Sequence, residues 1–132
     1  MMDFANNKSV PFEISDINHG LQKAKGLLKL IKGGIELEFE VQDSFFGMIN
    51  SGVQAAQFSY KDLESIQFEK GWLSAKIILE ANSIQVFADL PGSEQGRCTL
   101  KVKRKHKKEA QDLISKARLE FSEFKLDQLD ED

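Results

Sequence analysis

Lysine and arginine are concentrated between residues 101 and 108, and the chemistry open to such a run is the binding of anions. The run leads into an expected helix, whose N-terminal dipole disfavours cations, so an anionic partner is one interpretation. That partner would be a membrane surface, an acidic protein segment or RNA, and the binding residues would be Lys101, Lys103, Lys105, Lys107 and Lys108. No aromatic residue lies among these cations to stack on bases, which argues against nucleic acid.

The interpretation we favour for this run is structural. Lys101 and Lys103 alternate with Val102 and are expected on the outer face of a final strand, where lysine discourages edge-to-edge pairing. Glu109, or the acidic residues at 127–132, would then balance the remaining cations.

The connection at residues 43–52 carries large apolar side chains in a segment that should run over the surface. We expect Phe45 and Met48 to fold back over one end of the molecule as core, and Trp72, after Gly71, to cover an edge. The alternative is a contact surface for a protein partner or a second copy of the chain. Its residues would be Phe45, Phe46, Met48, Ile49 and Trp72.

Catalytic and metal-binding patterns do not emerge from local spacing. Alternation directs the carboxylates of residues 36–40 to solvent, where nothing raises their pKa for acid–base work. Cys98 has the parity of buried neighbours and is expected to be an inert thiol. His19 and His106 lie in no metal-ligand spacing. We therefore expect no enzymatic activity, no cofactor and no metal.

The elements that position these residues begin with a hairpin. Residues 34–41 alternate apolar and glutamate side chains, which predicts a strand with one buried face. Residues 27–32 form a second apolar run, and a turn centred on Gly33-Gly34 would join the two. This turn predicts three cross-strand pairs: Leu30 with Leu37, Leu28 with Phe39, and Lys29 with Glu38.

Shorter apolar patterns predict five further strands, at 54–60, 65–70, 73–80, 84–88 and 98–103. The period then changes, because an apolar stripe with helical spacing runs from Ala110 to Phe124. We expect residues 1–24 to form an arm or a short leader strand, 25–124 the domain, and 125–132 an acidic tail.

Length and composition suit one soluble domain. The chain has 132 residues and a formal net charge of -3, which does not indicate a dedicated nucleic-acid binder. Its one cysteine excludes an internal disulfide framework and fits a reducing cytoplasm.

Seven antiparallel strands followed by one helix is an element order that resembles the pleckstrin-homology-like (PH-like) barrel or sandwich, particularly its small bacterial members. The resemblance covers residues 26–121 and rests on these stretches: GLLKL at 26–30, GIELEF at 34–39, YKDLESI at 60–66, EKGW at 69–72 and LPG at 90–92. It implies a binding scaffold for lipid headgroups, peptides or self-association, and the fold alone does not choose among these.

Specific phosphoinositide binding is not expected from this resemblance. Lipid-binding members hold the headgroup with cations on the first two strands, where this chain offers Lys25, Lys29 and Lys32. The carboxylates at 36–40 on the neighbouring strand would repel such a headgroup. We therefore expect a non-enzymatic module that recognises a protein partner or self-associates through surface loops. The alternative is a peripheral membrane module that binds anionic lipid through residues 101–108.

Overall fold

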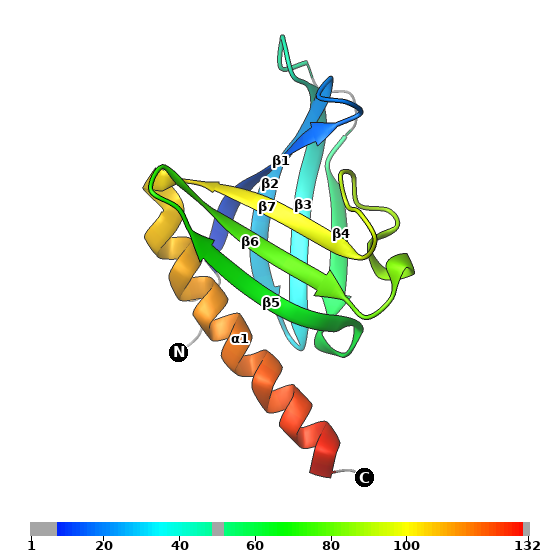
Figure 1. Cartoon of the computed structure of the whole chain (residues 1–132), viewed down its shortest axis with the longest axis vertical. Helices are drawn as coiled ribbons and strands as arrows, with labels where there is room; N and C mark the ends of the chain where they lie inside the picture. The colour runs from blue at the N-terminus through cyan, green and yellow to red at the C-terminus, as the bar shows by residue number, and fades with distance from the viewer. Residues whose placement is uncertain (1–7, 49–51, 131–132) are drawn as a thin grey trace.

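The computed structural model describes residues 8–48 and 52–130, which form one seven-stranded antiparallel sheet followed by a long helix (Figure 1). In spatial order the strands run β4-β3-β2-β1-β7-β6-β5. Their bounds are β1 Ser9–Ile17, β2 Gln22–Ile31, β3 Gly34–Asp43, β4 Gln54–Ser59, β5 Leu63–Lys70, β6 Ser74–Ala81 and β7 Arg97–Lys103. The expected fold class, a seven-stranded antiparallel sheet with one C-terminal helix, is confirmed.

The sheet bends into two layers without closing into a barrel. Strands β1–β4 form one layer and β5–β7 cross in front of it (Figure 1). The layers join where β1 meets β7, and the registered pair there is Glu13 with Lys101. In the described part of the chain no ladder joins the two edge strands, β4 and β5.

The strand expected at 84–88 is wrong. Residues Ile84–Phe87 form a 3-10 helix, η3, in which the Val86 amide donates to the Ser83 carbonyl at 3.3 Å. A period of three places Phe87 and Leu90 on one side, and both are buried. The alternation at 84, 86 and 88 therefore predicted the wrong buried positions, because the most buried residue of this segment is Phe87.

The seventh strand comes instead from the N-terminal segment. Alternate residues Val10, Phe12 and Ile14 are buried, and β1 lies between β2 and β7 in the middle of the sheet. The segment given above as an arm or leader strand thus supplies a central strand.

The β2–β3 hairpin forms, but its predicted register is wrong by two residues. Leu30 pairs with Ile35, Lys29 with Glu36 and Leu28 with Leu37, so the turn residues are Lys32 and Gly33. Gly33 has φ +76°, which a glycine adopts readily. Gly34 belongs to β3, where an added Cβ would collide with the Phe58 carbonyl oxygen of β4. A shift of two preserves which side chains face the core.

The final element, α1 (Lys107–Asp130), covers the gap between the two layers. It begins directly after the 3-10 segment η4 (Arg104–His106), which follows β7. Another 3-10 segment, η2 (Tyr60–Asp62), precedes β5. The predicted apolar stripe is confirmed: four of its residues are buried, and Phe121 and Phe124 pack partly buried against the core. The helix contacts β5 most extensively and also reaches β1, β2 and β3. Its last turns extend past the sheet (Figure 1).

Candidate functional site

The β3–β4 connection presents its aromatic side chains to solvent. Phe45 is 74% exposed, Phe46 85% and Met48 67%. The expectation that Phe45 and Met48 fold back as core is therefore wrong. Ile49, the fourth residue of the proposed contact set in this loop, lies outside the described residues.

Asp43, the last residue of β3, organises this connection. Its carboxylate accepts hydrogen bonds from the backbone amides of Phe46 at 2.6 Å, Met48 at 2.7 Å and Phe45 at 3.1 Å. The Asp43 amide in turn donates to the Met48 carbonyl at 3.0 Å. These amides, that of Phe46 foremost, lower the pKa of the Asp43 carboxyl. The two phenylalanines are thus exposed on a turn of fixed backbone conformation, which reduces the entropy cost of binding.

The β1–β2 turn adds an apolar side chain that the sequence did not single out. The Ser44 amide donates to the Leu21 carbonyl at 2.9 Å, and Leu21 is 51% exposed. Figure 1 shows both connections projecting together from one end of the sheet. We call Leu21, Phe45, Phe46 and Met48 the apolar tip. Only tertiary structure brings residue 21 beside 44, so no local signal could have found it.

Trp72 lies away from the apolar tip. It is 80% exposed, with Leu73 at 68%, so the expectation that it covers an edge is wrong. The β5–β6 turn that carries both residues is beside the start of α1 (Figure 1), where the Lys107 ammonium donates to the Gly71 carbonyl at 2.9 Å. The next residue, Ser74, pairs with Lys103 of β7. Trp72 therefore neighbours the basic run and not Phe45.

The structure divides the basic run. Lys101 and Lys103 lie on the outer face of β7, as expected. The expectation that they protect a sheet edge is wrong, because β7 lies between β1 and β6. Together with Lys105 and His106 they line a small pocket of about 160 Å³, into which β2 contributes Lys25. Lys107 is engaged with Gly71, and Lys108 is exposed on α1.

Among the described residues, the acidic side chains at 127–130 do not neutralise this pocket. Residues 127–130 belong to α1. A helix rises about 1.5 Å per residue, so Asp130 lies roughly 35 Å from the start of α1. Glu109 is closer, with its carboxylate 4.0 Å from His106 Nδ1.

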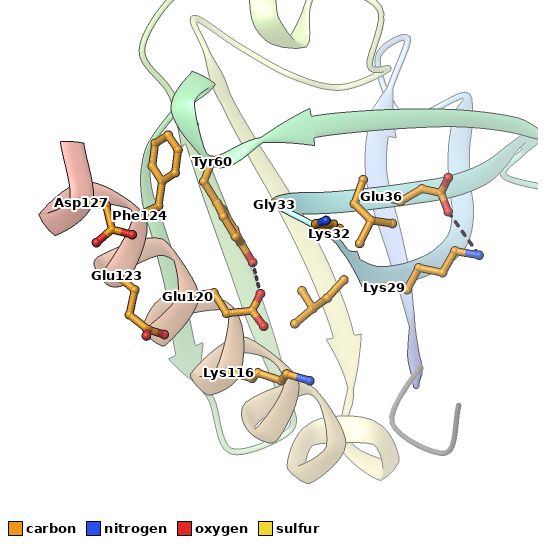
Figure 2. Close-up of a pocket in the computed structure, with 12 residues that line it drawn as sticks. Lys29, Lys32, Gly33, Glu36, Tyr60, Lys116, Glu120, Glu123, Phe124 and Asp127 are labelled. Carbon is orange, nitrogen blue, oxygen red and sulfur yellow. Dashed lines mark hydrogen bonds and ion pairs between the residues drawn. The ribbon is translucent and has the colours of Figure 1, made fainter. Parts of the chain in front are cut away.

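A larger cleft, of about 880 Å³, separates the β2–β3 hairpin from α1 (Figure 2). Its charges are mixed: Lys29, Lys32 and Glu36 come from the hairpin, and Lys116, Glu120, Glu123 and Asp127 from the helix. The Lys29 ammonium lies 3.2 Å from the Glu36 carboxylate, which also accepts from Gln57 at 2.9 Å. The Gln57 and Lys29 contacts lower the pKa of Glu36, and Glu36 raises that of Lys29. The hairpin wall of the cleft is thus largely self-neutralised.

Tyr60 stands at the helix side of this cleft. Its hydroxyl donates to the Glu120 carboxylate at 2.8 Å, which ties η2 to α1 (Figure 2). Burial, helped by Glu120, raises the pKa of Tyr60. The phenol therefore stays protonated, and the pair acts as a structural link between sheet and helix.

Chemically reactive groups are few among the described residues. Burial raises the pKa of the Cys98 thiol to about 12, and Cys98 is buried as expected. Within residues 8–48 and 52–130, no group of histidine, cysteine and carboxylate side chains could hold a metal ion. Over the same ranges, no helix has the length and apolar character needed to cross a membrane.

Comparison with known proteins finds no match, whether to a protein-family model, to a curated protein or to a solved structure. The function must be argued from the surfaces themselves.

Proposed function

We propose that the protein is a non-catalytic, PH-like binding module that inserts its apolar tip into an apolar pocket of a different protein. The observation that carries the proposal is the Asp43 carboxylate, which holds three backbone amides while Phe45 and Phe46 remain 74% and 85% exposed. Exposing two aromatic rings to water is unfavourable, yet the Asp43 turn holds both rings exposed. Such an exposed apolar surface is typical of a binding site.

The area of the tip suits an interface centre. A buried aromatic side chain contributes roughly 150–250 Å², so the two rings supply roughly half of the 800 Å² that each partner of a standard interface buries. Leu21 and Met48 extend the same surface. Binding energy concentrates in such central apolar anchors, so the tip has the character of a hot spot.

The occupant we infer is neither a second copy nor an anionic membrane. The tip protrudes and needs a concave apolar receiver, whereas each of four surface clefts among the described residues carries several charged side chains. An anionic membrane is disfavoured by charge, because residues 43–48 carry the Asp43 carboxylate and no cation.

Site-specific photo-cross-linking tests this proposal in the cells that produce the protein. A benzophenone amino acid replaces Phe46 in one protein and Ile84 in a matched control, because Ile84 is exposed on η3 at 67%. We expect one discrete adduct with a different protein from position 46 and none of that mass from position 84.

Other outcomes would overturn the proposal. A homodimeric adduct would assign the tip to a second copy, and adducts of equal pattern from both positions would mean that the tip has no specific partner. Adding the Phe45→Ser substitution to the position-46 protein serves as a second control, and it should reduce the specific adduct at least tenfold.

A further inference from the structure

A second surface, which we call the lysine pocket, lies on the outer face of the sheet where β1 crosses β7. Lys101 and Lys103 of β7, Lys105 and His106 of η4, and Lys25 of β2 line it. Its volume of about 160 Å³ exceeds several times the roughly 30 Å³ that one water molecule occupies in the liquid. The pocket can therefore hold a small anionic group.

The charge of the lysine pocket is unbalanced. Glu13 is the one carboxylate among its lining residues, and it is shared between Lys103 at 3.8 Å and Lys23 at 3.9 Å. Lys25, Lys101 and Lys105 make no ion pair with a carboxylate of the described residues.

The β6–β7 ladder adds to this imbalance. Lys101 faces Lys76 across that ladder, and like charges directly opposite each other repel. An anion in the pocket would offset this repulsion.

The β5–β6 turn indicates which source supplies the anion. Trp72 and Leu73 are exposed in that turn, which adjoins the pocket through the Ser74–Lys103 pair. Tryptophan with leucine beside a group of lysines is the composition of a membrane-surface anchor, because indole rings favour the headgroup region and lysines favour anionic lipid. Binding of a free phosphate would not involve the exposed side chains of Trp72 and Leu73.

We propose that this surface binds an anionic lipid membrane, with a lipid phosphate in the lysine pocket and Trp72 and Leu73 in the headgroup region. The proposal is independent of the function assigned to the apolar tip. Of the anion-binding residues predicted from the sequence, the proposal keeps Lys101, Lys103 and Lys105. It adds Lys25 and His106. Lys107 is assigned a structural role instead, because its ammonium donates to the Gly71 carbonyl.

Trp72 is the only tryptophan of the chain, so its fluorescence reports its own environment. The full chain is mixed with vesicles of phosphatidylcholine, with or without one third phosphatidylglycerol, and is then sedimented. With anionic vesicles we expect a blue shift of the emission and pelleting that decreases steeply between about 0.05 and 0.5 M salt. An unshifted emission with the protein in the supernatant would overturn the proposal.

Matched variants locate the binding surface. In K25Q/K101Q/K105Q we expect the partition coefficient to fall roughly 100-fold, because each lysine near an anionic leaflet strengthens binding about fivefold. The control K32Q/K61Q/K116Q has the same net charge, alters exposed lysines outside the pocket and should keep most of the binding. Equal losses in both triple variants would show that net charge alone acts.

Further arms separate the membrane from other anions. W72S/L73S should weaken vesicle binding while an unchanged melting temperature shows that it folds. Inorganic phosphate that shifts the amide signals of residues 101–106, without vesicle binding, would assign the pocket to a free anion and overturn the proposal. Vesicle binding that persists in F45S/F46S would show that this surface acts without the apolar tip, so the two proposals can fail separately.

Discussion

Two pairs of phenylalanines occupy opposite environments in this protein. Phe58 and Phe87 are buried to within 5% exposure, and their rings meet edge to face at 4.9 Å with an interplanar angle of 89°. Phe45 and Phe46 are adjacent in sequence, largely exposed, and held by a carboxylate beneath them. The buried pair stabilises the fold, whereas the exposed pair contributes little to it.

This difference shows how the molecule separates stability from recognition. The 3-10 segment η3 brings Phe87 against Phe58, whereas the strand expected there, with residues 84, 86 and 88 facing inward, would have placed residue 87 on the outer side. The tip is held by the hydrogen bonds of Asp43 and by the bond from the Ser44 amide to the Leu21 carbonyl. The two pairs should therefore respond in opposite ways to substitution.

The largest effect is expected from Phe87→Ala. Removing a fully buried ring leaves a cavity, and the free energy of unfolding should fall by about 3–5 kcal/mol. Urea denaturation followed by circular dichroism measures this. The single buried cysteine, Cys98, gives an independent check, because its reaction with a thiol reagent should accelerate in the variant. An unchanged unfolding midpoint would mean that η3 does not close the core.

Tyr60→Phe should have an intermediate effect. It removes the hydrogen bond to Glu120 but keeps the ring against Phe121, with centroids 6.0 Å apart. We expect a loss of about 1.5–3 kcal/mol, the usual contribution of a hydrogen bond to a charged acceptor. Thermal melting measures it, and Glu120→Gln should lose less because an amide oxygen still accepts. Equal stability of Tyr60→Phe and the wild type would show that the link does not hold α1.

The double substitution Phe45→Ser, Phe46→Ser should change the free energy of unfolding by less than about 0.5 kcal/mol, as exposed substitutions do. Binding of the cross-linked partner should nevertheless be lost. Loss of cooperative melting would instead show that these rings are core.

The smallest effect concerns acid pH. The pKa of Asp43 is lowered in the folded loop, so its stabilisation is present above the ordinary value of 3.8 and is lost as pH falls through the lower folded pKa. Amide NMR signals of Phe45, Phe46 and Met48 should move together in that range, and Asp43→Asn should abolish the transition while global unfolding stays elsewhere. A transition at the ordinary value would mean that the hydrogen bonds are absent in solution.

Hydrophobic patterns over a few residues predicted much of the fold. The strict alternation at 34–41 predicted β3, and the stripe from Ala110 to Phe124 predicted the buried face of α1. The hairpin register failed because both glycines were assigned to the turn, whereas Gly34 serves the close approach of β4. The strand at 84–88 failed because periods of two and three fit a short apolar segment equally well.

The site was less predictable, because exposure depends on what the rest of the chain covers. Phe45 and Trp72 were expected to be covered, and both are exposed. The hydrophobicity of a side chain is the same whether it is buried or exposed. Local sequence patterns do not tell which other segments cover Phe45 and Trp72.

The sequence by itself determined the alternation of buried and exposed faces, the helix stripe and the charge of residues 101–108, because each depends on side chains a few positions apart. Tertiary structure alone decided that Leu21 joins Phe45, that Lys25 joins Lys101, and that Trp72 adjoins the basic run. These contacts connect residues far apart in the chain, and strand order, which results from packing the whole core, brings them together.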